Sequence, residues 1–324
     1  MKNRISFIGT SILFLFLLIS TTTFAQYEKV DEKVKLYPKT FSDPLQLAQK
    51  IDSDFTKPEE KARAIFSWIA LNINYDLKAY YTQTNNGIAY SFSSLEDKIN
   101  KDFEFRRALV KKTLRTKKAV CEGYASLFVN LANAVGLEAV IVTGTSKIHE
   151  TQIGKLPKSS DHAWNAVKIN GEWKLVDATW GAGVVDTQQQ KFKPEFNDAY
   201  FFTDPEKFFL NHFPDDQKWL LTNKSAEDFA ALPLYFPEYL KLNYELSATE
   251  GHILFPKNVA VKFNIKNLKA PDELFYITSR DNIIKKLTVD AQNNFIIPPS
   301  DELSGYLTIF VNQNPLVTYK ILKK

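Results

Sequence analysis

Cys121 is the only cysteine in a sequence of 324 residues, and it begins a segment with helical periodicity. A single thiol cannot form an internal disulfide, and cysteine counting alone favours a small buried side chain. The position of Cys121 predicts something else, because the dipole at a helix N-terminus favours the thiolate, the nucleophilic form. A thiol nucleophile needs a base, and the base needs a group that orients it. A nucleophilic Cys121 therefore requires a histidine and a carboxylate that the fold brings together.

His162 and Asp177 lie in two predicted strands, residues 162–169 and 172–179, which the dipeptide Asn170-Gly171 joins. Asn-Gly is a strong signal of a two-residue hairpin turn. Because side chains alternate along a strand, this turn places Asp177 diagonally from His162 on one face. The carboxylate can then accept the imidazole N–H and fix its tautomer. A turn longer by one residue would move every side chain to the opposite face. The pattern predicts an imidazole base held by a carboxylate.

Other elements follow from hydrophobic periodicity. Apolar residues at helical spacing predict helices at about 57–74, with a Thr56–Glu59 capping box, and at 121–135. Residues 138–143 predict a buried strand, and residues 77–97 an irregular connection. A further helix is predicted to begin near Pro205. After about residue 225 short alternating strands predict a separate β-sandwich, residues 225–324.

Several motifs resemble those of a known family. Three segments look like the core motifs of the transglutaminase-like superfamily: Val120-Cys121-Glu122-Gly123-Tyr124-Ala125, Asp161-His162-Ala163-Trp164-Asn165, and the segment from Trp173 to Gly183. The segments 200–206, 212–214 and 219–221 resemble those that follow in its kyphoscoliosis-peptidase branch. The resemblance covers about residues 41–224. It implies an α+β, papain-like core in which a helix carrying cysteine packs on an antiparallel sheet. It also implies Cys121 as nucleophile, His162 as general base and acid, and Asp177 as the orienting group.

Two further residues are candidates for substrate binding. The hairpin register places Trp164 beside His162 and Asp177, although aromatic residues in a hairpin more often belong to the core. Residues 106–118 contain seven basic side chains and no acidic one, and they lead into the cysteine segment. Most of this run is predicted to be a solvated helix face above a buried stripe of Phe103, Val110 and Leu114. Lys117 and Lys118, at its end, are the candidates for attracting an anionic substrate group or keeping the thiol ionised, and Lys118 is the predicted substrate-binding residue.

No metal, cofactor or nucleic acid is expected. His149, His212 and His252 have no partner at metal-ligand spacing, and the chain has neither a His-Glu-x-x-His motif nor a glycine-rich phosphate loop. A formal charge of +4 is too small to indicate nucleic-acid binding. A composition with 44% hydrophobic and 24% charged residues predicts a packed globular chain.

The first 25 residues have the order of a secretory signal peptide: Lys2 and Arg4, an apolar run, and a small residue at Ala25. The apolar run is short for a membrane span, so we expect cleavage and no span in the mature chain. Residues 26–40 are then expected to be a linker. The predicted location is periplasmic or extracellular.

These observations predict an exported cysteine-dependent acyl-transfer enzyme that acts on peptide or amide bonds of a protein or peptide. Family analogy favours a peptidase or amidase over a cross-linking transglutaminase. The alternative from another class is an envelope or surface binding module on the same scaffold, whose thiol would be inert. The sequence does not indicate an oligomeric state.

Overall fold

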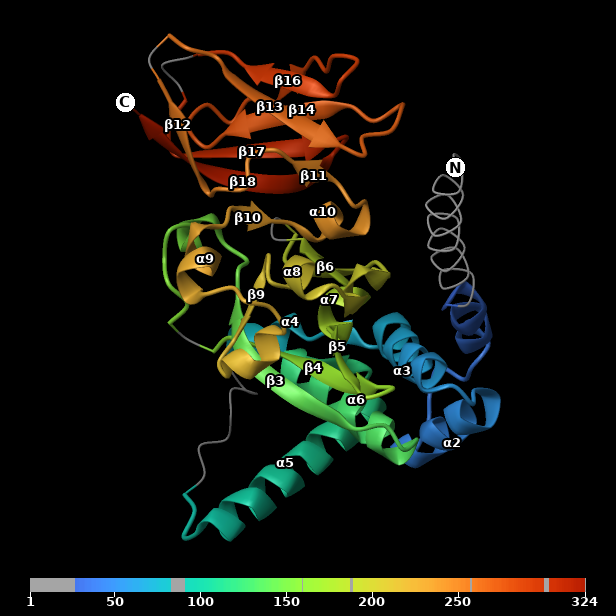
Figure 1. Ribbon diagram of the computed structural model, residues 1–324. Helices are drawn as coiled ribbons and strands as arrows, with labels where there is room; N and C mark the ends of the chain where they lie inside the picture. The colour runs from blue at the N-terminus through green and yellow to red at the C-terminus, as the bar shows by residue number, and fades with distance from the viewer. Residues whose placement is uncertain are drawn as a thin grey trace, which may run out of the picture. The chain divides into compact units, whose positions relative to one another are not determined.

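A computed structural model describes residues 27–82, 91–158, 160–186, 189–256, 258–299 and 303–323 (Figure 1). The expected signal peptide lies outside the described residues. The described chain forms two compact units. The first contains the residues up to Val140 together with Val167–Lys174 and Gly181–Phe196. The second contains Ile141–Ala166, Leu175–Trp180 and Asn197–Lys324.

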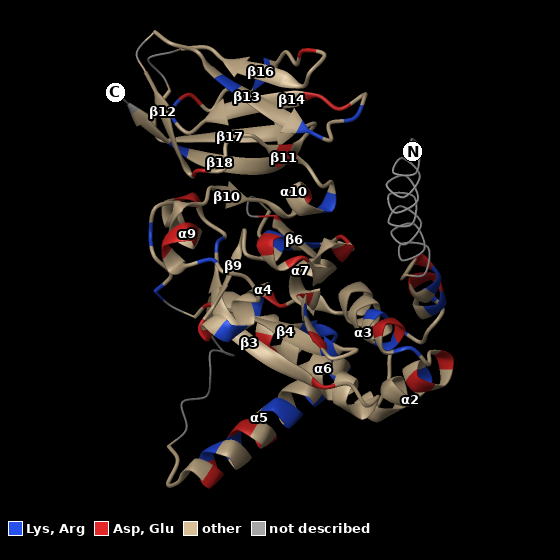
Figure 2. Cartoon of the chain, in the orientation of Figure 1, with Lys and Arg blue, Asp and Glu red and all other residues tan. Residues whose placement is uncertain are grey.

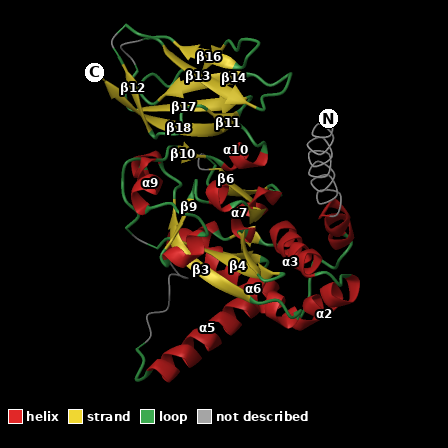
Figure 3. Ribbon diagram, viewed as in Figure 1, coloured by secondary structure: helices red, strands yellow, loops and turns green. Residues whose placement is uncertain are grey.

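The first unit is mainly helical (Figure 3). Besides a helix at residues 27–35, its helices are α2 (Pro44–Asp54), α3 (Pro58–Asn72), α4 (Leu77–Thr82), α5 (Leu95–Thr116) and α6 (Cys121–Ala134). It also holds the parallel pair β1 (Asn74–Tyr75) and β2 (Lys118–Ala119) and the hairpin β6 (Gly183–Asp186) and β7 (Lys191–Pro194). The predicted helices at 57–74 and 121–135 are confirmed. The predicted irregular connection at 77–97 is wrong where α4 and the start of α5 lie.

The start of α3 corrects one local prediction. The N-cap of α3 is Lys57, which makes no side-chain cap hydrogen bond, so the Thr56–Glu59 capping box is not formed. Pro58 occupies the first position of the helix, where its missing N–H costs nothing. Proline therefore sets this helix start without a side-chain cap.

The segment expected to be a linker contains the helix at residues 27–35. Its Asp31 is buried and accepts hydrogen bonds from Arg63 Nε at 2.9 Å and from Ser67 Oγ at 2.5 Å, both on α3. Val30 and Val34 are buried at helical spacing on the same segment. The helix is thus packed into the first unit through apolar contacts and a buried ion pair.

A five-stranded sheet carries the predicted hairpin. Its strand order is β8 (Phe201–Thr203), β5 (Glu172–Val176), β4 (His162–Ile169), β3 (Ala139–Ser146) and β9 (His212–Pro214). Asn170 and Gly171, between β4 and β5, have φ angles of 52° and 90°, as a two-residue hairpin turn requires. The predicted turn is confirmed. The second strand ends at Val176, earlier than predicted, because the short helix α7 (Ala178–Ala182) begins directly after Asp177.

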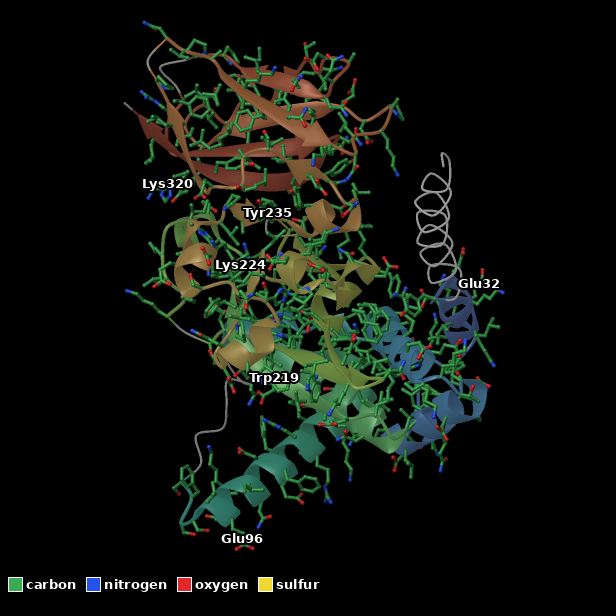
Figure 4. All side chains as sticks on the ribbon, in the orientation of Figure 1. Glu32, Glu96, Trp219, Lys224, Tyr235 and Lys320 are labelled. Carbon is green, nitrogen blue, oxygen red and sulfur yellow. The ribbon has the colours of Figure 1, made fainter. Side chains whose placement is uncertain are left out.

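The C-terminal strands of the second unit form two sheets. One has the order β10 (Leu234–Tyr235), β18 (Asn314–Lys323), β17 (Tyr306–Val311), β14 (Leu274–Thr278) and β15 (Lys285–Leu287), with β12 (His252–Phe255) parallel to β18. The other has the order β11 (Glu245–Leu246), β13 (Val261–Lys266) and β16 (Asn294–Ile297). Phe263 of the smaller sheet stacks on Phe295 at 5.2 Å and lies 6.0 Å from Tyr319 of the larger one. Buried Tyr235 marks β10 in Figure 4.

The second unit also contains three short helices: α8 (Pro205–Phe208), α9 (Ala226–Ala231) and α10 (Pro237–Lys241). The first is the helix predicted near Pro205, and its N-cap is Asp204, whose side chain accepts the backbone N–H of Glu206. Mixed helices and antiparallel sheets confirm the predicted α+β class. Among the described residues, no helix has both the length and the apolar character that crossing a membrane requires.

Candidate active site

Cys121 is the first residue of α6 and is partly exposed. Two contacts within the first unit fix this helix. Tyr124 Oη donates to the carbonyl oxygen of Ile73 at 2.6 Å. Gly123 lies so close to its neighbours that a Cβ there would come within 2.6 Å of Ala119 Cβ and 2.8 Å of Thr113 Oγ1. Only glycine fits at this position, two residues after the cysteine, and its lack of a side chain allows the start of α6 to pack closely against Thr113 and Ala119.

His162 begins β4, and the residue before it helps to fix its position. Asp161 Oδ1 accepts the backbone N–H of Ser146 at 2.7 Å and its hydroxyl at 2.9 Å. The backbone N–H of Asp161 donates to Gly144 O at 2.9 Å. Both partners belong to β3, so the start of β4 is tied to its neighbouring strand just where the imidazole leaves the backbone.

Asp177 is fully buried, and its two carboxylate oxygens accept hydrogen bonds from different groups. Oδ1 accepts the backbone N–H groups of Thr179 at 2.8 Å and Trp180 at 3.1 Å, as a helix N-cap does for α7. Oδ2 lies 2.7 Å from His162 Nε2, which confirms the contact that the hairpin register predicted. The same Oδ2 lies 3.0 Å from Nε2 of a second histidine, His212. Four hydrogen-bond partners thus surround one carboxylate.

The carboxylate of Asp177 is ionised. Burial alone would raise its pKa, but the charge of His162 and the hydrogen bonds from both imidazoles outweigh burial and hold the pKa well below its ordinary range. An ionised carboxylate only accepts hydrogen bonds, so both nitrogens that face Oδ2 act as donors. In His162, Nε2 therefore carries a proton, and Nδ1 is the ring nitrogen that does not face Asp177.

His212 was not predicted as a site residue. It comes from the edge strand β9, where it pairs with Ser146 of β3, and its side chain is completely buried. Its Nδ1 lies 2.9 Å from the side-chain oxygen Oδ1 of Asn211. The sequence offered one signal, since the segment that begins with His212 resembles a segment of the kyphoscoliosis-peptidase branch. Spacing along the chain gave none, because 35 residues separate His212 from Asp177.

Aromatic rings enclose the two imidazoles. Phe208 stacks on His212 with ring centroids 4.0 Å apart and an interplanar angle of 24°. The ring centroid of Trp180 lies 4.8 Å from that of His212 and 5.9 Å from that of His162. Trp164 was predicted to bind substrate. Its ring centroid lies 5.0 Å from that of His212 and 5.9 Å from that of His162, and the residue is only 1% exposed. Its observed contacts are ring packing around the histidines, and they leave little of its surface for a substrate.

The cluster also has the composition of a metal site. One ligand-type atom from each of His162, Asp177 and His212 lies within 4.8 Å of the others, and all three residues are buried. Two histidines and a carboxylate suit zinc or a similar ion. The same short distances also arise when two N–H groups share one carboxylate oxygen, so the group has an explanation that needs no ion.

Comparison with known proteins identifies the domain that holds Cys121, His162 and Asp177. Residues 45–178 match the family model of the transglutaminase-like superfamily. Over 176 residues the chain is 38% identical to kyphoscoliosis peptidase of Mus musculus, covering 54% of this chain and 23% of that protein. The Homo sapiens protein of the same name is 38% identical over 163 residues, covering 50% and 22%. The chain carries a transglutaminase-like domain of the kyphoscoliosis-peptidase type.

The chain spans less than a quarter of the length of these two relatives. A solved structure of a TGase is 17% identical and covers 48% of this chain and 32% of its own, with a TM-score of 0.28. Within the transglutaminase-like domain, Cys121, His162 and Asp177 all fall inside the matched residues 45–178, whereas His212 lies beyond them.

The basic run of the transglutaminase-like domain follows the second half of α5 into β2 (Figure 2). Val110 and Leu114 are buried as predicted, but Phe103 is 62% exposed, so the predicted stripe ends before it. Lys117 adopts a left-handed conformation at the helix end, and its Nζ lies 4.5 Å from the ring centroid of Trp68. Burial lowers the pKa of Lys117 to about 8. Lys118 is exposed on β2, and its role in substrate binding stays a prediction.

Proposed function

We propose that the chain is a cysteine-dependent acyl-transfer enzyme acting on peptide or amide bonds, with Cys121, His162 and Asp177 as its triad. The hydrogen bond of 2.7 Å between His162 Nε2 and buried Asp177 Oδ2 carries the proposal. A histidine held in one tautomer by an ionised carboxylate is the orienting half of a thiol triad. The nucleophile is the cysteine that begins α6, inside the same transglutaminase-like domain.

In the proposed reaction, the Cys121 thiol gives its proton to His162 Nδ1, and Sγ attacks the carbonyl carbon while one electron pair of the C=O bond moves to the oxygen. His162, which uses Nε2 to hold Asp177, gives a proton from Nδ1 to the leaving amine as the C–N bond breaks. The product is a thioester and a free amine. Nδ1 then removes a proton from the acceptor that attacks the thioester, and it returns this proton to Sγ as the C–S bond breaks, so that the thiol is restored. Asp177 stays ionised throughout and stabilises the imidazolium.

The acceptor decides the type of enzyme. Water gives a peptidase or amidase, and an amine gives a transglutaminase. We propose hydrolysis, because the similar full-length relatives are named peptidases. The backbone N–H of Cys121 is the proposed first donor to the oxyanion, since a helix start leaves such groups without an intrahelical partner.

Thiol alkylation tests the proposal directly. Because Cys121 is the only cysteine, the mass shift after iodoacetamide treatment reports that thiol alone. We expect the folded wild type at pH 6.5 to react at least about tenfold faster than the same chain in urea, because an ordinary thiol is only a few per cent ionised near neutrality. His162→Ala should remove most of this advantage. His149→Ala, which changes an exposed histidine, is the matched control.

An assay with casein then separates the two acyl acceptors. New amino termini indicate hydrolysis, and incorporation of a labelled primary amine indicates transfer; Cys121→Ser should abolish both. A folded wild type whose thiol reacts no faster than the chain in urea would contradict the triad. The alternative, a binding module on a transglutaminase-like scaffold, would then take its place.

We also propose that the chain is exported, on the signal-peptide order of residues 1–25 alone. Protein recovered from the envelope or the medium should begin near Gln26 in N-terminal analysis. A mature chain that still begins at Met1 would refute export without affecting the triad.

A further inference from the structure

Two imidazoles share a single oxygen of Asp177, and only one of them is needed for a triad. His162 Nε2 and His212 Nε2 lie 2.7 Å and 3.0 Å from Oδ2. The other oxygen is occupied by two backbone N–H groups. The side chain of His212 is 0% exposed, so it does not meet solvent.

The surroundings of His212 fix its ring in one place. Stacked Phe208 sets the plane of the ring at a centroid distance of 4.0 Å. The Asn211 side chain meets Nδ1 at 2.9 Å, and β9 pairs with β3 through His212 and Ser146. These three contacts restrict the movement of the His212 ring. Its Nε2–H therefore approaches Oδ2 from a constant direction. Such fixed donors are how protein sites orient a carboxylate that must in turn orient a catalytic group.

The protonation of the cluster agrees with this arrangement. Burial lowers the pKa of His212, while the hydrogen bond to Asp177 acts in the opposite direction. A neutral His212 carries one ring proton, and ionised Asp177 requires that proton on Nε2. In the structure Nδ1 faces two oxygen acceptors, Asn211 Oδ1 at 2.9 Å and the backbone of Phe208, so a neutral His212 with its proton on Nε2 requires the Asn211 amide to be turned over.

We propose that His212 is a positioning residue for the acyl-transfer site: it donates from Nε2 to Asp177 Oδ2 and so keeps this oxygen aimed at His162. The role rests on the proposed function. Without the donor, Oδ2 is held only by His162, the group that it has to orient, and the backbone N–H groups at Oδ1 are the remaining restraint on the carboxylate. His162 then spends less time with Nδ1 directed for proton transfer.

Two substitutions separate donation from packing. His212→Phe fills the same space and can still stack on Phe208, but it has no N–H. His212→Gln loses the ring but can present an amide N–H near the position of Nε2. If His212 acts by donation, His212→Phe should lower the alkylation rate of Cys121 at pH 6.5 by about tenfold, or about 1.4 kcal/mol in activation free energy. His212→Gln should recover most of that loss. A residue that only filled space would give the opposite order.

A double-mutant cycle tests whether the effect passes through His162. In the His162→Ala background, His212→Phe should cause no further loss, because the group it positions is gone. Circular dichroism and the rate in urea identify any variant that has unfolded. An equal fractional loss in both backgrounds would overturn the proposal, as would a His212→Phe protein that reacts like the wild type.

The same experiment keeps this inference apart from the proposed function. If His162→Ala reacts like the wild type, the triad itself is wrong. If His162→Ala is slow and His212→Phe is not, only the role of His212 is wrong. A chelator supplies the last arm: the rate in EDTA should equal the rate without it. A changed rate would assign the three residues to a metal ion and overturn the hydrogen-bonding role.

Discussion

Replacing Asp177 by asparagine changes one atom of the hydrogen-bonded cluster and reverses its polarity. Oδ1 can still accept from Thr179 and Trp180, because an amide oxygen takes the place of a carboxylate oxygen. The amide nitrogen, however, would stand where Oδ2 now accepts from His162 and His212. Two N–H groups would face an NH₂ group, so each imidazole must move its proton to Nδ1 or turn away.

The contacts of Oδ2 determine how much stability the substitution removes. Hydrogen bonds to a charged group contribute about 1.5–3 kcal/mol each, and the amide recovers part of this by donating to the rearranged imidazoles. We expect Asp177→Asn to lower the free energy of unfolding by about 2–3 kcal/mol at pH 7. The exposed Asp215, which accepts from Thr143 Oγ1, supplies a matched control; Asp215→Asn should change stability by less than about 0.5 kcal/mol.

The difference between wild type and Asp177→Asn should also depend on pH. The pKa of Asp177 is lower in the folded protein than in the unfolded chain, so the unfolded chain binds more protons in acid. The stability that ionised Asp177 contributes is therefore present above about pH 5 and declines as the pH falls below the unfolded value, about 3.9. Urea unfolding at pH 7, 4 and 3 should show the two proteins converging. A constant difference, or equal stability at pH 7, would refute this account of the carboxylate.

Three further predictions concern the surroundings of the site. Gly144→Ala would place a Cβ 2.2 Å from Phe213 O in the backbone of β9, and it should destabilise the protein by about 2 kcal/mol or more in urea. Burial lowers the pKa of Lys147 to about 7, so the unfolded chain binds more protons above that value; between pH 7 and 9.5 stability should rise more in the wild type than in Lys147→Met, in which Lys117 still contributes. With four histidines in the chain, nitrogen-15 spectra can resolve His212, which should stay neutral at pH 6.5, where an ordinary histidine is half protonated. A half-protonated His212 at that pH would contradict its assignment as a neutral donor.

The sequence predicted the half of the site that local rules control. The Asn170-Gly171 turn determines which residues of β4 and β5 lie near each other, so His162 and Asp177 could be paired without a structure. The same rule failed at the end of β5, where Asp177 leaves the strand and caps α7. The contact survived this error because Asp177 directly follows the strand, at the end of the hairpin where β4 begins with His162.

His212 could not be found in this way. Its contact with Asp177 depends on the order of the strands in the sheet, in which β9 joins the far side of β3. No periodicity in the chain encodes that order, since β9 is three residues long and follows a short helix. The helix at 27–35 was missed for a similar reason. Val30 and Val34 have helical spacing, but the partner that holds Asp31 is Arg63, 32 residues away.

Asp31 and Asp177 are both buried carboxylates, but the groups that they contact differ in whether they can titrate near neutral pH. Asp31 is paired with Arg63, whose guanidinium stays charged at any pH at which proteins fold, and with the Ser67 hydroxyl. No proton can move near neutrality in that cluster, so its ion pair can only hold a helix in place. Asp177 is paired with two imidazoles, the side chains whose charge changes most readily near neutral pH. One of them, His212, is sealed among aromatic rings and keeps its proton, whereas His162 retains a small exposed fraction of 6% in its side chain. In the proposed reaction, His162 is therefore the member of this cluster that exchanges a proton with the reactant, while Asp177 and His212 hold it in position.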